Sequence, residues 1–414
     1  MLRFSTAGES HGEALVANIS GLPAGIAISE AYVDRELWRR QQGFGRGGRM
    51  RIESDHARIL SGVRHGHSIG SPIAMLIENR DWQNWSESLP VGQGDPEKHK
   101  AVKSPRPGHA DLAGALKYNL PEARYVLERA SARETTARVA AGAVAKQVLA
   151  ALEIEVLSHV IQVGSARLAR AVSFDVLRSL AAKDEVLLNC ADDESEQQMK
   201  AEVDAVLRNG DTVGGVFEVV AHNVPPGLGS YANWDERLDA KFAAAVMSIQ
   251  AVKAVEIGDG VLGAASHGSQ AQDEIGYSRR ASQDLTQSVT QSVTQSDEPA
   301  GTLHSRFTDF TRAGNHAGGV EGGISNGCDI VVRGHMKPIS TLRRPLGSVS
   351  FATREPVKAA YERSDVCAVP AAGVIGEAMV ALVLATAVLE KFGGDSLVEL
   401  RRNYEGYCEQ LRNY

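Results

Sequence analysis

The stretch V-C-A-V-P-A-A-G-V-I-G-E-A-M-V-A-L-V-L-A-T-A-V-L, residues 366–389, is the longest apolar run in the chain and sets its architecture. A run of this length is compatible with a membrane span, but Pro370, two glycines and Glu377 interrupt it, so a buried helix is the better interpretation. We predict that the helix covers residues 371–392. Gly393 and Gly394 end it, since glycine is favoured just past a helix C-terminus.

Helices and short strands are expected on both sides of this run, without the regular alternation of a doubly wound sheet. Apolar spacing and capping residues predict four further helices, over residues 29–42, 130–152, 193–208 and 233–252. Short β-like runs lie at 15–19, 73–77, 216–220 and 330–332. We therefore predict an α+β fold in a single large domain, 1–414. Residues 279–299 carry a polar Thr-Gln-Ser-Val repeat that is expected to be a disordered insertion.

The bulk composition indicates an ordinary soluble protein. The formal net charge is −7, and the sequence pI of about 6.0 argues against a nonspecific nucleic-acid binder. Four widely spaced cysteines favour neither a zinc site nor a disulfide framework. No signal peptide is evident, so a cytoplasmic location is expected, with no membrane partner and no metal.

A glycine- and arginine-rich segment, residues 41–51 (Q-Q-G-F-G-R-G-G-R-M-R), stands out against this acidic background. Arginine forks grip phosphate or carboxylate with paired hydrogen bonds, and glycine allows close backbone approach, so an anion pocket is the favoured interpretation. The segment also fits G-x-G-x-x-G, but a charged helix precedes it where a dinucleotide site requires a strand. An arginine-glycine RNA-binding segment is the second alternative.

Four other segments suggest the same kind of site. Gly8–Gly12 (G-E-S-H-G) fits a hydrolase nucleophile elbow, but a strand follows it where a helix is needed, and His11 is the residue of interest. Segment 104–111 places Arg106 near His109, and Ser131 lies where a helix N-terminus could hold phosphate. Residues 315–344 are rich in glycine and basic residues. Each has a purely structural alternative, and His65 and His67 are interpreted as surface residues. Together they indicate a polyanionic substrate and proton chemistry.

These segments resemble the chorismate synthase family. The matching motifs run in order along the chain and are G-E-S-H-G at 8–12, Q-Q-G-F-G-R-G-G-R-M at 41–50, R-P-G-H-A-D at 106–111, S-A-R-E-T at 131–135, S-I-Q-A-V-K-A-V-E-I-G-D-G at 248–260, A-G-G-V-E-G-G-I-S-N-G at 317–327, K-P-I-S-T at 337–341 and R-S-D-V-C-A-V-P-A-A at 363–372. The polar repeat is the departure. The resemblance implies a β-α-β sandwich, a homotetramer, and a lyase that converts 5-enolpyruvylshikimate-3-phosphate to chorismate with reduced FMN and no net redox change.

The resemblance also implies roles for particular residues. His11 protonates the departing phosphate, His109 protonates the reduced flavin, and Asp365 helps relay the C6 proton. Substrate binding carries over to Arg40, Arg46, Arg49, Arg106 and Arg133. Cofactor binding carries over to Arg40, Arg46, Arg129, Ala130, Ser131, Gln250, Ala251, Gly322, Lys337, Pro338, Ile339, Ser340, Thr341 and Arg363. NADPH is a possible ultimate reductant, and because no reductase domain is evident, an external flavin reductant is expected. Another FMN oxidoreductase and an RNA-binding module remain as alternatives.

Overall fold

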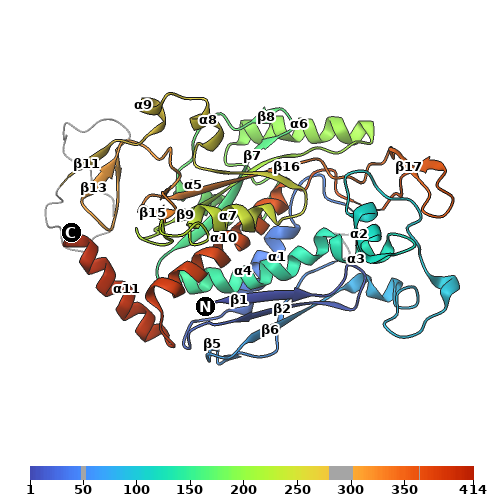
Figure 1. Ribbon diagram of the computed structural model, residues 1–414, viewed down its shortest axis with the longest axis horizontal. Coiled ribbons are helices and arrows are strands. Elements are labelled where there is room, and N and C mark those ends of the chain that lie inside the picture. The colour runs from blue at the N-terminus through green and yellow to red at the C-terminus, as the bar shows by residue number, and fades with distance from the viewer. Residues whose placement is uncertain (48–52, 279–301, 363) are drawn as a thin grey trace.

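The computed structural model describes residues 1–47, 53–278, 302–362 and 364–414. Its centre is the helix α10 (Val369–Phe392), which coincides with the long apolar run. Two further helices, α1 (Glu30–Gln41) and α4 (Thr135–Ala150), pack beside α10 to form a middle layer, with one sheet below and another above (Figure 1). This is the β-α-β sandwich that the sequence predicts.

The lower sheet is formed by the N-terminal part of the chain. Its antiparallel order is β1 (Arg3–Ala7), β2 (Ala14–Ser20), β6 (Ile73–Glu78) and β3 (Arg58–Ile59). Leu15, Ala17 and Ile19 alternate with more exposed residues along β2 and are fully buried. One face of this sheet therefore covers the helical layer, as expected for period-two alternation.

The upper sheet is also antiparallel. Its order is β10 (Val252–Ile257), β16 (Ile330–Met336), β9 (Gly215–His222), β7 (Glu155–Val163) and β8 (Ala166–Arg167). Phe217 and Val219 on β9 point to the α10 side and are fully buried, whereas Glu218 between them lies on the other face. The core therefore fills the space between the two sheets, around α10.

Other elements complete the chain at the edges and ends of these layers. The helices are α2 (Asp111–Tyr118), α3 (Arg124–Ala130), α5 (Phe174–Ala181), α6 (Asp193–Asn209), α7 (Leu238–Met247), α8 (Gly260–Ala264), α9 (Gly268–Ala271) and α11 (Leu397–Arg412), with 3-10 turns η2 (Arg80–Asn84), η3 (Pro96–Lys98) and η4 (Ala132–Glu134). The short strands are β4 (Val63–Arg64), β5 (His67–Ser68), β11 (Ile275–Tyr277), β12 (Leu303–His304), β13 (Phe310–Arg312), β14 (Val320–Glu321), β15 (Ile324–Ser325), β17 (Gly347–Val349) and β18 (Pro356–Lys358).

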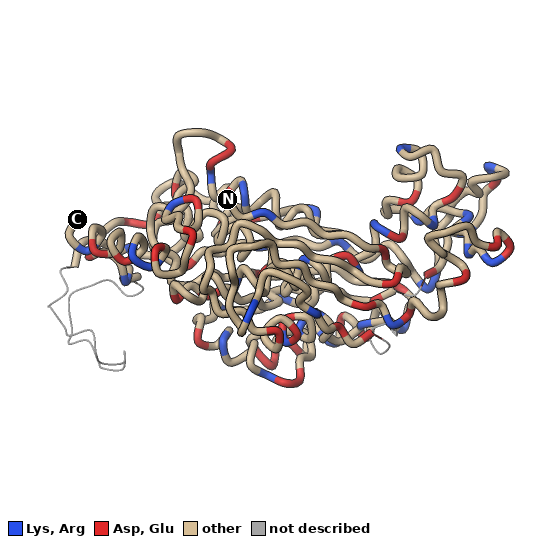
Figure 2. Tube along the Cα trace, turned by 90° about the horizontal axis from the view of Figure 1, so that it is seen from below, with Lys and Arg blue, Asp and Glu red and all other residues tan. Residues whose placement is uncertain are grey.

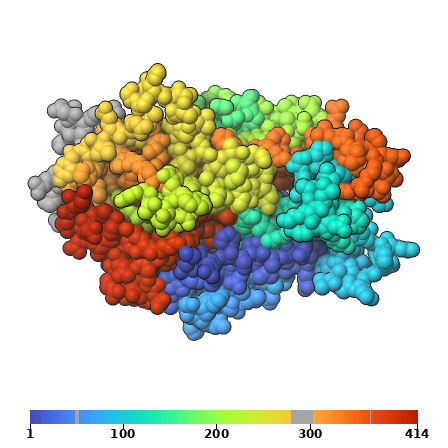
Figure 3. Space-filling view, viewed as in Figure 1, coloured from blue at the N-terminus to red at the C-terminus, as the bar shows by residue number. Residues whose placement is uncertain are grey.

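Charged residues of both signs occur along the whole chain, and a segment near its N-terminus lies beside a segment near its C-terminus. Acidic and basic residues are interspersed along the trace (Figure 2). The N-terminal strands and the C-terminal red segment lie side by side (Figure 3), where Ala24 forms a parallel bridge to Ser396 just before α11.

The apolar run is a core helix. It is long and apolar enough to cross a membrane, yet 89% of its most apolar window is buried within the protein. Close packing of α10 on α4 explains part of this burial, because a Cβ added at Gly142 of α4 would lie 2.4 Å from the Cα of Ala378. The small residues of α4 thus allow the two helix backbones to approach each other.

We predict that Gly142→Ala destabilises the protein by about 1–3 kcal/mol, because α10 must shift to admit the methyl group, and that this outweighs the helix propensity gained. Urea denaturation measures the change. Gly406→Ala on α11 is the matched control: nothing lies within 4 Å of its added Cβ, so that variant should be slightly more stable. A Gly142→Ala variant as stable as wild type would contradict the packing argument.

Several predicted boundaries need correction. The helix predicted over 130–152 begins only at Thr135, because Ser131 caps the short turn η4 between α3 and α4. The helix predicted over 233–252 is the shorter α7. Strands β1, β7 and β10 were missed. The predicted helices at 29–42 and 193–208 are confirmed, with side-chain caps from Ser29 and Asp192.

Two other predictions concern loops. His65 and His67 are exposed at the turn of the β4–β5 hairpin, which confirms them as surface residues. The polar insertion predicted at 279–299 lies outside the described residues.

A fully charged cluster lies buried between α1, α4, α10 and β7. Glu377 of α10 is 0% exposed and accepts two hydrogen bonds of 2.7 Å from Arg39 and one of 2.7 Å from Lys146. Glu36 accepts from the same two cations, and the hydroxyl of Ser158 donates to Glu377. Two carboxylates therefore balance two cations, so the burial of each charge is compensated by opposite charges and hydrogen bonds.

Candidate active site

A cavity of about 810 Å³ lies at the end of the helical layer, where the N-termini of α4 and α10 meet the edges of both sheets. Basic side chains and histidines dominate its polar lining, and these come from segments far apart in the sequence. They are His11, Arg40, Arg46, Lys100, Arg106, His109, Arg133 and Lys337. The acidic lining residues are Asp81, Glu362 and Asp365. The cavity therefore favours an anionic ligand.

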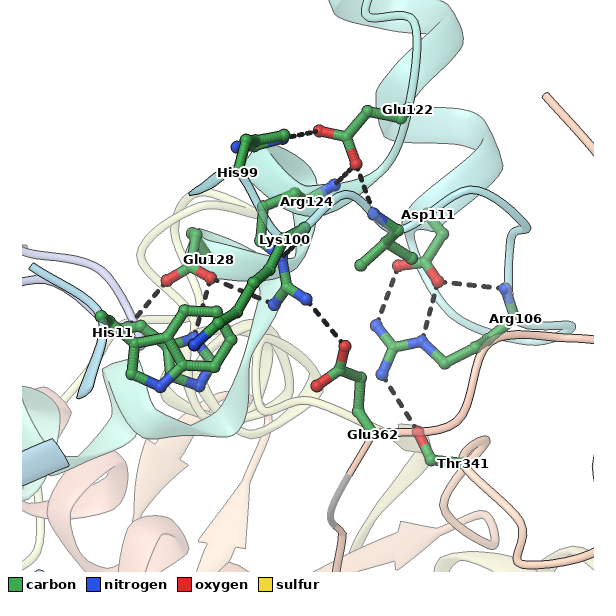
Figure 4. Close-up of polar contacts among 12 residues, drawn as sticks. His11, His99, Lys100, Arg106, Asp111, Glu122, Arg124, Glu128, Thr341 and Glu362 are labelled. Carbon is green, nitrogen blue, oxygen red and sulfur yellow. Dashed lines mark hydrogen bonds and ion pairs between the residues drawn. The ribbon is translucent and has the colours of Figure 1, made fainter. Parts of the chain in front are cut away.

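His11 lies in the turn after β1 and is tied to α3. Its ring Nδ1 lies 2.8 Å from Oε1 of Glu128, and its backbone N–H donates to Oε2 of the same carboxylate at 2.7 Å (Figure 4). The indole of Trp85 lies against the imidazole, with ring centroids 3.9 Å apart and ring planes tilted by 31°. Burial alone would raise the pKa of Glu128, but the hydrogen bonds from His11 and the charge of Arg124 lower it below its ordinary value.

His109 has a carboxylate partner of its own at the N-terminus of α2. Its Nδ1 lies 2.5 Å from Oδ1 of Asp111. Arg106 donates to both oxygens of the same carboxylate, at 2.8 and 2.9 Å, and to Thr341 at 3.0 Å (Figure 4). Although burial alone would raise the pKa of Asp111, the hydrogen bonds from Arg106 and His109 hold it well below its usual range.

Two of the arginines predicted to bind substrate are held in place by other residues of the protein. The guanidinium of Arg106 is held by Asp111, and that of Arg133 by Asn79 at 2.7 Å and by Asp55 at 2.6 Å. Both line the cavity, but their strongest hydrogen bonds are internal. Both guanidinium groups are thus fixed in place. They contribute positive charge to the cavity wall, while most of their N–H groups are already used in hydrogen bonds within the protein.

Arg40 retains an unsatisfied group. Its Nε and Nη2 donate to Thr135 and to the Ala132 carbonyl, but its buried Nη1 has no hydrogen-bond partner within the described residues. Burial lowers the pKa of Arg40 to about 9, and the neighbouring charges of Arg46 and Arg133 also lower it, while Asp55 opposes the shift. A bound anion would offset this repulsion, so the three arginines favour an anion in this part of the cavity.

The glycine-arginine segment packs against the segment that precedes α10. Asp365 accepts a 2.6 Å hydrogen bond from the backbone N–H of Gly47 and lies 3.3 Å from Nη1 of Arg46. Gly45 has φ +83°, and a Cβ there would lie 2.9 Å from a methyl group of Val203. Glycine is therefore needed both for the turn and for the close approach. Arg49 and Arg363 lie outside the described residues.

Most residues predicted to bind the cofactor are brought together. Those that line the cavity are Arg40, Arg46, Ala130, Ser131, Gln250, Ala251, Lys337, Ile339, Ser340 and Thr341. Arg129, Gly322 and Pro338 are not among the lining residues. Arg129 donates instead to the carbonyls of Thr6 and Gly8 on the β1 side, and Gly322 lies in the turn between β14 and β15.

The groups at this site that the sequence did not indicate include Glu128, Trp85 and Lys100, and the acidic lining residues Asp81 and Glu362. Glu128 stands directly before Arg129, but the helix was expected to begin after it. Trp85 and Lys100 belong to the 80–103 segment, which carries no periodic pattern. Lys100 lies over the Trp85 ring, 4.2 Å from its centroid. The tryptophan in a polar segment is the signal that could have indicated a site.

The cavity suits a flavin mononucleotide together with a small substrate. Its volume lies in the upper part of the range of about 300–1,000 Å³ that ligand pockets occupy. The amide oxygen of Gln250 is buried without a hydrogen-bond partner within the described residues, and lysine, serine and threonine side chains of 337–341 line the same wall. Such donors and acceptors fit a phosphorylated heterocycle. Across the described ranges, no group of three or more His, Cys, Asp or Glu side chains could hold a metal ion.

The fold and this cavity define an α+β protein that binds polyanionic small molecules and carries paired histidine–carboxylate groups. The sequence model of the chorismate synthase family matches residues 2–389. The chain is 68% identical to chorismate synthase of Koribacter versatilis and 64% identical to that of Acidobacterium capsulatum, each over the full length of both chains. A crystal structure of chorismate synthase, 38% identical, superposes with a TM-score of 0.74 and covers 100% of this chain and 99% of its own.

The chain therefore belongs to the chorismate synthase family. This enzyme is a phosphate lyase of the shikimate pathway. It removes phosphate and a proton from 5-enolpyruvylshikimate-3-phosphate to give chorismate, and the family uses reduced FMN.

Proposed function

We propose that the 810 Å³ cavity is the chorismate synthase active site, and that His11, His109 and Asp365 carry its proton chemistry. The observation that supports this most strongly is that two histidines, each beside its own carboxylate, line one cavity with Arg40, Arg46 and Arg133. The substrate carries two carboxylates and a phosphate, and this cluster of fixed cations matches that charge.

The cofactor would be held by the wall formed by Ser131, Gln250, Ala251 and residues 337–341. When bound, reduced FMN supplies electron density to the ring from which phosphate leaves. Ala251 has φ +67°, an uncommon conformation for alanine, and its carbonyl accepts from the backbone of Lys337 at 3.0 Å. This contact fixes the backbone turn that brings the Lys337 amine to 2.6 Å from the Gly108 carbonyl, beside His109.

Each titratable group has a distinct task. His11 gives a proton to the departing phosphate, since a poor leaving group gains most from a general acid. Asp365, held by Gly47 and Arg46, takes part in removing the C6 proton. His109, fixed by Asp111, holds a proton on the cofactor side of the cavity.

We infer the remaining features from the resemblance and from composition. The protein assembles as a homotetramer in the cytoplasm and takes reduced flavin from an external reductant, with NADPH as the ultimate electron source. Gly322 and Arg129 do not line the cavity of one chain, so their contribution to the cofactor site is not supported by this geometry.

An anaerobic assay tests the proposal. With chemically reduced FMN the enzyme should form chorismate, followed by ultraviolet absorbance, over many turnovers while the flavin stays reduced. Oxidised FMN with NADPH should give no product. Flavin oxidised in proportion to product would indicate an oxidoreductase, and product from oxidised FMN with NADPH would show that the chain reduces its own flavin.

A further inference from the structure

We propose that Glu128 is a positioning residue for His11: its carboxylate holds the ring through Nδ1 and so sets which ring nitrogen faces the cavity to give up the proton. The inference rests on the proposed role of His11 as the general acid. Glu128 itself is not among the cavity-lining residues, and only 6% of its side chain is exposed, so it acts through the histidine.

The contact uses both carboxylate oxygens on one residue. Oε1 faces ring Nδ1 at 2.8 Å, and Oε2 accepts from the His11 backbone N–H at 2.7 Å. Ser10, the preceding residue, donates its backbone N–H to the Glu128 carbonyl at 2.8 Å. The turn that carries His11 is therefore fixed to α3 at three points, which leaves the imidazole little freedom to rotate (Figure 4).

The protonation of the ring follows from this geometry. An ionised carboxylate only accepts hydrogen bonds, so the Nδ1 that faces Glu128 carries hydrogen. Neutral His11 then presents Nε2 to the cavity as an acceptor, and only the imidazolium can donate a proton there. The contact with Glu128 therefore fixes the direction in which the imidazolium gives its proton to the cavity.

Neighbouring groups reinforce the pair without replacing it. Trp85 lies against the imidazole and covers one of its faces. Arg124 lies 3.6 Å from Glu128 and donates to Glu362 at 2.8 Å, and its own position is fixed by the Lys100 carbonyl at 2.7 Å. Arg124 thus places a positive charge near the Glu128 carboxylate, in addition to the hydrogen bonds that this carboxylate makes with His11.

The second histidine is paired differently. Asp111 bonds His109, but both of its oxygens also accept from Arg106, so its charge is shared with a permanent cation. Glu128 directs both oxygens at His11, and Arg124 stands farther away. Of the two carboxylates, Glu128 is therefore the one whose two oxygens both contact its histidine, whereas Asp111 is shared between His109 and Arg106.

The test is a double-mutant cycle between His11→Ala and Glu128→Gln, assayed with saturating reduced FMN under anaerobic conditions. Glu128→Gln should lower kcat by roughly 10- to 100-fold with little change in the KM for substrate. In the His11→Ala background the same substitution should cause no further loss, because residues that act as a unit are non-additive. Glu128→Asp should recover part of the rate.

Glu122→Gln is the matched control. Glu122 makes the same kind of contact, to His99 at 3.2 Å, and is buried nearby, but neither residue lines the cavity. This variant should keep its kcat per folded enzyme even where its stability falls.

The outcomes separate the two proposals. Wild-type kcat in Glu128→Gln, or additive losses in the double variant, would overturn the positioning role. A normal rate in His11→Ala would instead remove the role proposed for His11 and with it the basis of the inference. Urea denaturation of every variant identifies any loss of rate that comes from unfolding.

Discussion

Replacing Glu377 with alanine should destabilise the protein by about 3–5 kcal/mol, because it leaves Arg39 and Lys146 buried beside Glu36 alone. One uncompensated positive charge would then remain in the centre of the helical layer. Glu377→Gln keeps the volume but not the charge, and should cost nearly as much. Equilibrium urea denaturation at a fixed protein concentration measures both changes.

The pH dependence follows from the same contacts. Burial raises the pKa of Glu377, but Arg39 and Lys146 outweigh this effect and lower it to about 2. A carboxyl whose folded pKa is depressed stabilises the fold above its unfolded pKa of about 4.3, and that contribution is lost as the pH falls through the folded value. As the pH falls from about 4.3 to 2, Glu377 becomes protonated in wild type and its contribution to the unfolding free energy is lost. Glu377→Ala lacks this contribution at every pH, so the difference in unfolding free energy between the two proteins should shrink.

Glu87→Gln is the control, because Glu87 makes a 2.8 Å ion pair with Lys98 in which both side chains are exposed. That substitution should cause no measurable change in the unfolding free energy, since solvent screens the attraction between exposed charges. If Glu377→Ala were no less stable than Glu87→Gln, the buried cluster would not be the compensated charge centre that its hydrogen bonds indicate.

Glu377 also shows how far sequence alone can go. Glu377, together with Pro370 and two glycines in the same apolar run, favoured a buried helix over a membrane span. Its partners could not be predicted, because Arg39, Lys146 and Ser158 lie 219 to 338 positions away. Local signals therefore identified the helix and its burial, while the charge pairing depended on the packing of three layers.

The same distinction applies to the remaining elements. The capping residue Ser29 indicated the start of α1, and Gly210 indicated the end of α6, since such caps act within a few residues. They did not reveal the break between α3 and α4, where Ser131 caps a separate turn. Strand β7 was missed because Ser158 and His159 interrupt its apolar pattern; Ser158 is satisfied by Glu377, which is a tertiary contact.

At the site, motifs located the arginines and histidines but not their partners. Arg46 and Asp365 come together from segments 319 positions apart, and both were expected to act there through the resemblance. The carboxylates that hold Arg133 and His11, Asp55 and Glu128, carried no signal of their own, because a lone acidic residue is usually a solvated one. The site therefore depends on contacts between residues far apart in the sequence, which local motifs do not reveal.

His11→Ala should lower kcat by about 10²- to 10⁴-fold, or roughly 3–5 kcal/mol of transition-state stabilisation. The phosphate then leaves without a proton donor in a cavity that is otherwise intact. FMN affinity, followed by fluorescence titration, should stay near the wild-type value, because the proposed cofactor wall lies at Ser131, Gln250 and residues 337–341. A fall in kcat without a rise in KM would indicate an interaction made only in the transition state.

His67→Ala is the matched control, because His67 is exposed in the β4–β5 hairpin and does not line the cavity. Its kcat should equal that of wild type.

His109→Ala should also slow turnover, but it should raise the KM for substrate as well. Arg106 keeps its hydrogen bonds to Asp111 in this variant. The Asp111 carboxylate, however, loses its contact with His109, so more of its negative charge acts on the anionic substrate. A raised KM in His109→Ala with an unchanged KM in His11→Ala would show that the two histidines have different roles. Wild-type turnover in His11→Ala would instead show that His11 is only a structural contact between the turn after β1 and α3.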